Sequence, residues 1–423
     1  MSDARAATEA VFRVERTRLV GGLLRYVGDV GLAEDLAQDA LVAALEQWPA
    51  DGVPRNPGAW LMTVARRRAV DLVRRDRVLA DKYALVAPTL QSTSSGPDEE
   101  ALDGDGIDDD VLRLVFVACH PVLPPAARVA LALRLLGGLT TAEIARAYGQ
   151  PETTVAQRIS RAKKTIAQAG APFEVPTGDD RAARLPSVLE VVYLVFNEGY
   201  TATAGDDWAR PELCFEALRL ARVLAALLPD EPEVLGLQAL LELQSSRLDA
   251  RVGPDGAPVL LADQDRRRWD RLLIRRGLDA LARAEARGGR GPYVLQAAIA
   301  ACHARAFSVD ETDWTRIAAL YAELVALVPS PVVELNRAVA VARAVGPQEG
   351  LDVVDALAAT GTLDAYHLLP SVRADLLVRL GRVDEARGEL VRAAGMTANL
   401  RERDLLLRRW HDLDGTAAPA DET

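Results

Sequence analysis

Apolar residues recur every three or four positions along most of the chain, and proline and glycine interrupt this pattern at intervals. A period of this kind is typical of amphipathic helices. In the N-terminal part it predicts a helix that begins near Val11, a second helix over residues 32–48 and a third over residues 57–77. A proline and an Asp-Gly pair that follow residue 48 are expected to end the second helix.

The helical pattern stops between residues 81 and 110, where the chain becomes rich in Ser, Gly, Pro and Asp. Eight acidic residues lie between residues 88 and 110: Asp98, Glu99, Glu100, Asp103, Asp105, Asp108, Asp109 and Asp110. A segment of this composition has too little apolar surface to bury, so we predict a flexible linker over residues 81–110. The linker separates an N-terminal helical domain, residues 1–80, from the next unit.

A second helical unit is predicted over residues 111–170. Its helices are expected over residues 111–119, 124–136, 141–148 and 152–169. A tight turn that contains glycine and proline joins the last two, and a short helix, a tight turn and a longer helix make a helix-turn-helix. Residues 171–185 hold further prolines and glycines and are expected to form a second linker.

The C-terminal half, residues 186–412, is predicted to be helical throughout and to contain internal repeats. One unit has the spacing of a tetratricopeptide repeat, with small or apolar residues at Ala374, Leu377, Gly381, Ala386, Leu390 and Ala393. Two other units match less well, so an irregular helical bundle is the alternative. Residues 413–423 are read as a tail. The predicted fold class is therefore all-α, with a TPR-like helical-repeat domain after two smaller helical domains.

The composition excludes several classes of protein. The chain has 423 residues and a formal net charge of −11, so a uniformly basic surface for nucleic acid is excluded, although a local basic face is not. No apolar run approaches the roughly 20 residues that span a bilayer, and the N-terminus does not resemble a signal peptide. Three cysteines in a chain of this length are too few for a disulfide framework. We expect a cytoplasmic protein with no membrane partner.

The second helix of the helix-turn-helix has two contrasting faces. Val155, Ile159, Ala162 and Ile166 share one face and should pack inward. The opposite face carries Thr154, Gln157, Arg158, Arg161 and Lys164. Arginine can bind guanine and glutamine can bind adenine when such a helix enters the major groove of DNA. The alternative is an ordinary solvated face.

The third predicted helix is strongly basic. Six arginines, Arg66, Arg67, Arg68, Arg74, Arg75 and Arg77, are opposed only by Asp71 and Asp76. Arginine can neutralise phosphates and stack on unpaired bases. The alternative is a salt-bridged solvent face, in which Arg67, Asp71 and Arg75 are spaced for pairing one helical turn apart.

The second predicted helix begins with the polar cluster Glu34, Asp35, Gln38 and Asp39. Acidic residues at this end complement the helix dipole. A surface for protein docking is the alternative reading.

These three helices, in this order, resemble those of an extracytoplasmic-function (ECF) sigma factor of bacterial RNA polymerase. GLAEDLAQDALVAALEQWP resembles the helix that docks on the polymerase clamp, PGAWLMTVARRRAVDLVRR the helix that recognises the −10 element, and LTTAEIARAYGQPETTVAQRISRAKK the helix-turn-helix that reads the −35 element. VVYLVFNEGYTA, LADQDRRRWDRLLI and SPVVELNRAVAVARA resemble the sigma group that carries a large TPR-like, DUF6596-type extension.

The resemblance implies a transcription initiation factor whose partners are core RNA polymerase, through its clamp helices and flap, and promoter DNA. The implied polymerase-binding residues are Asp35, Gln38 and Asp39. The implied −10 residues are Trp60, Arg66, Arg67, Asp71, Arg74 and Arg75. The implied −35 residues are Thr153, Thr154, Gln157, Arg158, Arg161 and Lys164.

The extension is expected to regulate the sigma regions in cis, and a protein or peptide is its expected partner. Polar and aromatic residues set among its apolar helices either line a groove or serve as caps and buried hydrogen-bond partners: Asn197, Glu198, Tyr200, Asp263, Gln264, Asp265, Trp269 and Asn336. Arg266, Arg267 and Arg268 are flanked by aspartates, which favours pairing at the surface.

We expect no catalytic residues, metal or cofactor. The adjacent pairs Cys119-His120 and Cys302-His303 lack the spacing of structural zinc sites, and neither a GxSxG motif nor a phosphate-binding loop is present. Two other function classes stay open. One is a helix-turn-helix regulator that acts without polymerase. The other is a repeat scaffold or a hydrolase centred on Asn197-Glu198 and Asp263–Asp265.

Overall fold

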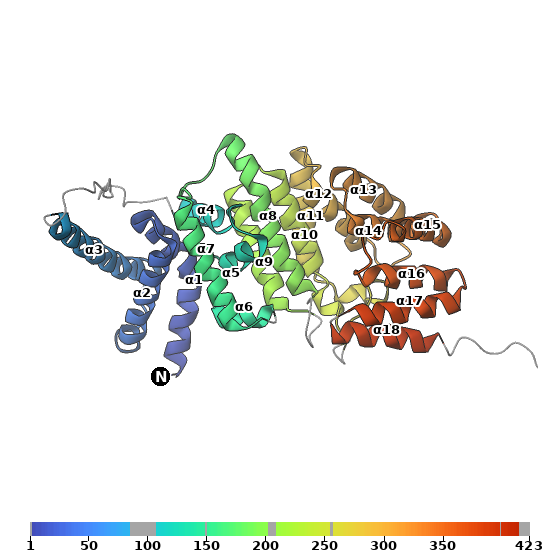
Figure 1. Ribbon diagram of the computed structural model, residues 1–423, viewed down its shortest axis with the longest axis horizontal. Helices are drawn as coiled ribbons and strands as arrows, with labels where there is room; N and C mark the ends of the chain where they lie inside the picture. The colour runs from blue at the N-terminus through green and yellow to red at the C-terminus, as the bar shows by residue number, and fades with distance from the viewer. Residues whose placement is uncertain are drawn as a thin grey trace, which may run out of the picture. The chain divides into compact units, whose positions relative to one another are not determined.

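The computed structural model describes residues 2–84, 107–148, 150–201, 209–253, 257–397 and 399–413. Helices account for 76% of the chain, and the described residues contain no strand beyond an isolated bridge between Val252 and Pro258. The predicted all-α fold is confirmed (Figure 1). The chain divides into two compact units, which are residues 1–146 with 150–191 and residues 147–149 with 192–423.

The first unit contains the helices that the periodicity predicts, with small differences at their ends. They are α1 (Ser2–Val27), α2 (Val30–Asp51), α3 (Pro57–Ala84), α4 (Ile107–Ala118), α5 (Pro125–Leu135), α6 (Thr141–Ala147), α7 (Glu152–Gln168) and the first part of α8 (Gly178–Tyr200). Pro49 lies inside α2 instead of ending it. The helix ends at Gly52, where φ is +82° and the amide donates a hydrogen bond to the Trp48 carbonyl.

Both predicted linkers are shorter than expected. Helix α3 continues to Ala84 and α4 begins at Ile107, so both ends of the stretch 81–110 are helical, while residues 85–106 lie outside the described part. Asp110, one of the eight acids assigned to the linker, is buried and paired with Arg113 at 2.7 Å. Arg25 of α1 also lies 3.7 Å from this carboxylate, a long-range contact that composition alone does not reveal.

The second predicted linker, 171–185, also becomes helical from Gly178 onward. The first part of α8 packs inside the first unit, where the Ser187 hydroxyl donates to the Cys119 carbonyl at 2.6 Å. Arg128 bonds to the same hydroxyl and pairs with Glu190 at 2.9 Å. These contacts extend the first unit well beyond the end of α7.

A buried carboxylate on α2 connects four helices of the first unit. Glu34 is only 3% exposed and forms ion pairs with Arg16 of α1, Arg134 of α5 and Lys163 of α7. The Lys163 Nζ lies 2.6 Å from the carboxylate. A further hydrogen bond supports the contact between α1 and the end of α5: the Arg16 guanidinium donates to the Arg134 carbonyl at 2.8 Å. We call Glu34, Arg16, Arg134 and Lys163 the Glu34 cluster.

The Glu34 cluster holds the carboxylate in its charged form. Burial by itself raises the pKa of Glu34, but the positive charges of Arg134, Lys163 and Arg16 outweigh burial and bring the pKa below its usual value of 4.5. The charge on Glu34 is therefore part of the folded structure at neutral pH.

The second unit consists of successive helices. They are the end of α8, α9 (Pro211–Leu227), α10 (Pro232–Ser245), α11 (Arg271–Ala286), α12 (Pro292–Arg305), α13 (Trp314–Leu327), α14 (Pro331–Ala344), α15 (Pro347–Ala358), α16 (Leu368–Arg379), α17 (Val383–Met396) and α18 (Leu400–Asp412). Many of them begin with proline, which lacks an amide hydrogen that the first turn would leave unpaired. Residues 246–270 separate α10 from α11, and the described part of this stretch contains three short 3-10 helices, Leu248–Ala250, Leu261–Asp263 and Arg266–Arg268.

The predicted repeat unit around Gly381 falls on the helix pair α16–α17. Gly381 makes the turn between the helices with φ +74°, a conformation that favours glycine. The small residues Ala374 and Ala386 are fully buried and allow the two helices to approach closely.

Gly199, near the end of α8, needs to be glycine for a different reason, which is the close approach of neighbouring backbone. A Cβ atom there would lie 2.7 Å from the Cys214 amide nitrogen and 2.9 Å from the Arg210 carbonyl oxygen. Any larger residue would collide with the backbone at the start of α9. Within the described residues, none of the helices has both the length and the apolar character needed to span a bilayer.

The Glu34 cluster yields a stability prediction. Glu34→Gln should lower the free energy of unfolding at neutral pH by about 3–5 kcal/mol, because it leaves buried cations without a partner. Folding lowers the pKa of Glu34, so its stabilisation is complete above the unfolded-state pKa and is lost as the pH falls through the folded-state pKa. The difference between wild type and variant should therefore shrink below pH 4.5.

Urea unfolding followed by circular dichroism at several pH values would measure this difference. Glu46→Gln is a matched control, since Glu46 is an exposed glutamate on the same helix. Equal unfolding free energies for Glu34→Gln and wild type at neutral pH would contradict the role of the cluster.

Candidate nucleic-acid interface

The helix-turn-helix begins with a reciprocal cap. The Thr140 amide donates to the Glu143 carboxylate at 2.7 Å, and the Glu143 amide donates to the Thr140 hydroxyl at 3.1 Å. This arrangement satisfies amides that the first turn of α6 would otherwise leave unpaired. The cap fixes the point at which α6 starts, and the short connection to α7 follows from it.

Helix α7 has the two faces that the sequence predicts. Its apolar residues Val155, Ile159, Ala162 and Ile166 are all buried. On the other side Thr153, Thr154, Gln157, Arg161 and Lys164 are exposed, and Arg158 is half-buried. The outer face is thus open to a ligand along its length.

The cations of this outer face form no ion pair with the described residues. In the part of the chain that the structure describes, no carboxylate pairs with Arg158, Arg161 or Lys164, whereas the neighbouring Lys163 turns inward to Glu34. An ordinary salt-bridged surface would show such pairs. Unpaired cations beside exposed threonine and glutamine side chains suit binding to phosphates and base edges.

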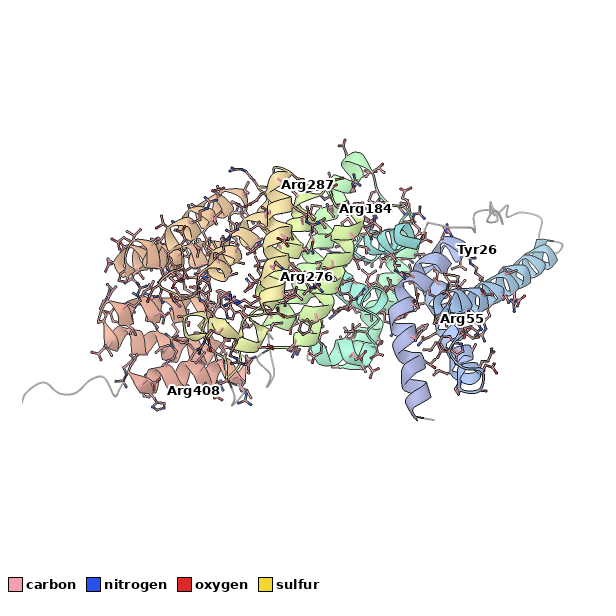
Figure 2. The ribbon with its side chains drawn as sticks, turned by 180° about the vertical axis from the view of Figure 1, so that it is seen from behind. Tyr26, Arg55, Arg184, Arg276, Arg287 and Arg408 are labelled. Carbon is pink, nitrogen blue, oxygen red and sulfur yellow. The ribbon has the colours of Figure 1, made fainter. Side chains whose placement is uncertain are left out.

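Helix α3 is divided between packing and exposure. Leu61, Ala65 and Ala69 are buried, and Trp60 packs edge-on against Trp48 at 5.4 Å between ring centroids. The Arg66 guanidinium lies 5.9 Å from the ring of Tyr26, which Figure 2 labels. Trp60 and Arg66, both predicted −10 residues, therefore also have structural contacts.

After Ala69 the described side chains of α3, which end at Leu72, face solvent. Arg67, Val70, Asp71 and Leu72 are exposed. Leu72 is exposed although it is apolar. The predicted ion pair between Arg67 and Asp71 is absent from the described residues, so the salt-bridged alternative loses support there.

The other two predicted −10 residues, Arg74 and Arg75, lie on α3, but their side chains fall outside the described residues. Sequence reasoning missed the apolar side chain of Val70, which is 51% exposed beside Arg67 and Asp71. An exposed valine within a basic helix can pack against an unstacked base.

The acidic cluster at the start of α2 separates into two parts. Asp35, Gln38 and Asp39 are exposed, as a docking surface requires, and Asp39 lies 3.3 Å from Arg68 of α3. Glu34 turns inward to the Glu34 cluster instead. The sequence held one signal that Glu34 is buried. It lies one turn after Val30 and one turn before Ala37, and both of these residues are buried.

The cysteine and histidine pairs fit a structural role. Burial raises the pKa of the Cys119 thiol to about 12, and the thiol of Cys214 likewise to about 12. Among the described residues, no group of three His, Cys, Asp or Glu side chains could hold a metal ion.

Comparison with known families assigns three segments. Residues 11–78 match "Sigma-70 region 2" and residues 113–166 match "Sigma-70, region 4". Residues 184–285 match a "Family of unknown function (DUF6596)". The first two segments contain the exposed faces of α2, α3 and α7 described above.

Relatives match the chain over different lengths. "Uncharacterized protein R00370" of Rhizobium meliloti is 46% identical over 390 residues, which cover 92% of this chain and 91% of the relative. "Probable ECF RNA polymerase sigma factor SigI" of Mycobacterium tuberculosis is 30% identical over 157 residues, 37% of this chain and 53% of that protein. "ECF RNA polymerase sigma factor SigC" of the same species is 30% identical over 145 residues, 33% of this chain and 71% of that protein. No solved structure matches the chain significantly.

The N-terminal similarity to ECF sigma factors agrees with the two matched sigma-70 regions and with their order along the chain. The chain therefore belongs to the ECF sigma factors of the sigma-70 family and carries a DUF6596 domain after its two sigma regions.

Proposed function

We propose that this protein directs core RNA polymerase to promoters with paired −35 and −10 elements, and that its C-terminal domain controls this activity. Membership of the family makes it a non-enzymatic subunit that acts in transcription initiation with core RNA polymerase and promoter DNA. The residues that make each contact, and the role of the C-terminal domain, are the proposal. Because the protein would act on promoter DNA, the proposed function also implies a cytoplasmic location.

The observation that carries the proposal is the outer face of α7. Its exposed Thr153, Thr154 and Gln157 lie toward the N-terminal end of the helix, and Arg158, Arg161 and Lys164 follow without carboxylate partners. Recognition helices place their N-terminal residues against base edges and their flanking cations on phosphates. We assign the −35 element to this face.

Helix α3 is assigned to the −10 element. Arg67, Val70 and Asp71 are exposed together and combine a cation, an apolar surface and a hydrogen-bond acceptor. Arginine stacks on a base that has left the duplex, and an apolar side chain covers its edge. We assign the exposed side of α2, at Asp35, Gln38 and Asp39, to the polymerase clamp, and contacts of the second sigma region to the flap.

Promoter binding requires the two sigma regions to separate. The Glu34 cluster joins α2 directly to α7, yet two DNA elements about two helical turns apart are separated by roughly 70 Å. Only 22 residues lie between Ala84 and Ile107, and a chain of that length reaches about 75 Å when fully extended. We therefore infer that the Glu34 cluster breaks when the protein engages a promoter.

The −35 assignment predicts the effect of one arginine. Arg161→Ala should lower transcription from a −35-dependent promoter about tenfold or more, because a direct contact to a base or phosphate is lost. Arg18→Ala is the matched control, since Arg18 is an exposed arginine on α1 outside the proposed surfaces.

Run-off transcription with core polymerase would measure both variants, with thermal unfolding as a check on folding. Wild-type transcription by a folded Arg161→Ala protein would refute the assignment of this arginine to DNA.

The function as a whole is tested by reconstituted transcription on a library of promoter fragments, with transcript starts determined by sequencing. Full-length protein with core polymerase should give starts downstream of a shared two-part motif. A polypeptide of residues 1–191 should use the same motif, and the ratio of its yield to that of the full chain gives the sign of regulation. This polypeptide keeps the part of α8 that packs on α4 and α5.

Two outcomes would contradict the proposal. Absence of starts with either folded protein, beside an active reference sigma factor, would refute promoter recognition with polymerase. Equal yields from the full chain and from residues 1–191 would refute the regulatory role of the C-terminal domain and leave promoter recognition standing.

A further inference from the structure

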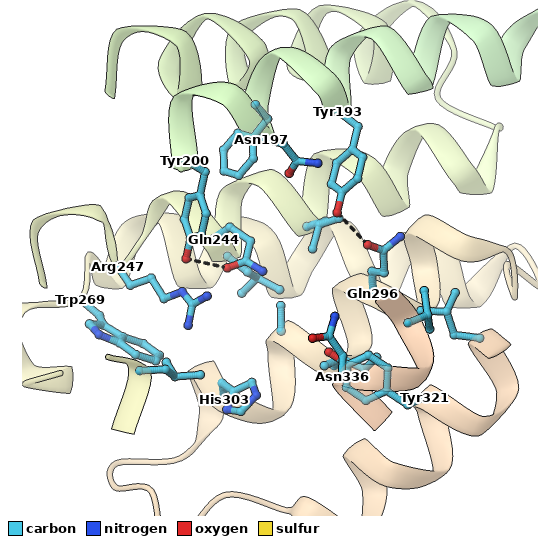
Figure 3. A pocket seen from close by; sticks show the side chains of 18 residues that line it. Tyr193, Asn197, Tyr200, Gln244, Arg247, Trp269, Gln296, His303, Tyr321 and Asn336 are labelled. Carbon is cyan, nitrogen blue, oxygen red and sulfur yellow. Dashed lines mark hydrogen bonds between the residues drawn. The ribbon is translucent and has the colours of Figure 1, made fainter. Parts of the chain in front are cut away.

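A cavity of about 300 Å³ lies inside the second unit, among the end of α8 and helices α10, α12, α13 and α14 (Figure 3). Its volume is equivalent to about ten water molecules. Neither sigma region contributes to it. The cavity lies in the part of the protein that contains the DUF6596 segment and the helices that follow it.

Aromatic and aliphatic side chains form much of the wall. Tyr200 and Trp269 lie toward one end, and Tyr193 and Tyr321 toward the other (Figure 3). Phe196 also lines the cavity and stacks on Tyr200, with 5.4 Å between ring centroids. Flat walls of this kind suit a ligand with a planar apolar body.

Hydrogen bonds fix two of the polar side chains. The Tyr200 hydroxyl donates to the Gln244 side-chain oxygen at 3.1 Å, and the Tyr193 hydroxyl donates to the Gln296 side-chain oxygen at 3.0 Å. Both bonds use the acceptor end of an amide. The Gln244 amide nitrogen stays available as a donor at the cavity wall.

Arg247 supplies a positive charge that the cavity wall does not balance. No aspartate or glutamate is among the residues that line the cavity. In the described chain the Arg247 guanidinium forms no ion pair or hydrogen bond. It lies over the Tyr200 ring, 5.5 Å from the ring centroid. Its Nε atom is buried without a partner. The Arg247 side chain is half-buried, and a partly desolvated cation without an anion favours the binding of one.

The other polar side chains that line the cavity supply hydrogen-bond donors, but they carry no formal charge. Burial, together with the charges of Arg247 and Arg266, lowers the pKa of His303 to about 3, so this imidazole is neutral. Burial raises the pKa of Tyr321 to about 12, so its hydroxyl keeps its proton. The Asn336 amide has no hydrogen-bond partner among the described residues and extends into the cavity (Figure 3).

From these contacts we propose that the cavity binds a small organic anion, a carboxylate attached to a flat aromatic body. The carboxylate pairs with Arg247 and accepts hydrogen bonds from neighbouring donors such as Asn336. The aromatic body packs between the tyrosine, tryptophan and aliphatic side chains of the wall. The binding site is complete within the second unit, and the proposal is independent of promoter recognition.

Four of the eight groove candidates named from the sequence line this cavity: Asn197, Tyr200, Trp269 and Asn336. The other four have structural contacts or face solvent. Glu198 pairs with Arg210, the Gln264 amide donates to the Val259 carbonyl, Asp265 caps a short helix and Asp263 is exposed. The centre proposed for a hydrolase is therefore not assembled.

The run Arg266–Arg268 also differs from its prediction at one position. Arg266 is buried and donates to the His303 carbonyl at 3.0 Å and to the Thr312 hydroxyl at 3.0 Å. It thus holds the end of α12, which carries His303 at the cavity. Arg267 keeps the predicted surface pair with Asp265 at 2.9 Å.

Isothermal titration of the full-length protein tests the proposal. The probes are phenylacetate and indole-3-acetate, each with its neutral amide, phenylacetamide and indole-3-acetamide, and inorganic phosphate. At least one of the two carboxylates should bind with a 1:1 ratio. Its amide should bind about tenfold or more weakly, because the amide has no charge to pair with Arg247.

Two variants locate the binding site. Arg247→Gln removes the charge and Asn336→Asp adds an opposing one at nearly unchanged size, so each should weaken carboxylate binding about tenfold or more. Arg276→Gln is the matched control, because Arg276 is an exposed arginine on α11 away from the cavity (Figure 2). Circular dichroism checks folding, and Asn336→Asp keeps the test decisive if Arg247→Gln fails to fold.

The proposal would be overturned by absence of binding by both carboxylates, by equal binding of carboxylate and amide, or by binding that persists in the folded Asn336→Asp protein. Binding of phosphate without either carboxylate would also overturn it. Because the readout is direct binding, failure here leaves the transcription result untouched, and failure of transcription leaves the binding result untouched.

Discussion

The first unit depends on a buried negative charge. Glu34 lies in an apolar layer where an isolated carboxylate would be unstable, and the cations of α1, α5 and α7 compensate it. This set of ion pairs places the helices of the two sigma regions in one unit. It also binds Lys163, the residue beside Lys164 on the proposed DNA face, so the same helix carries an internal contact and an external one.

Much of this fold follows from local patterns in the sequence. The helices of the first unit lie where the apolar period predicts them, and the buried face of α7 has the predicted residues. The failures share a cause, which is contact between distant residues. Asp110 looks like a linker acid, but Arg25 of α1 lies 3.7 Å from its carboxylate and α4 packs against α1. The beginning of α8 looks like a linker until Ser187 reaches Cys119.

Candidate site residues show the same limit. Exposure of Gln157, Arg161 and Lys164 follows from the helical period, because a polar stripe opposite a buried stripe faces outward. The cavity does not follow from any single stripe, since Arg247 lies in the turn after α10, His303 on α12 and Tyr321 on α13. Their unpaired charge and donors become visible only when the fold shows which groups lack partners.

The central claim is that a closed pair of sigma regions opens on the promoter. Spin labels at Gln47→Cys on α2 and Gln168→Cys on α7, both exposed positions, would measure it by double electron–electron resonance in a protein with Cys302→Ser. The account predicts one short distance in the free protein and a much longer one with core polymerase and promoter, where the DNA elements lie roughly 70 Å apart. An unchanged short distance in a complex that actively transcribes would contradict it.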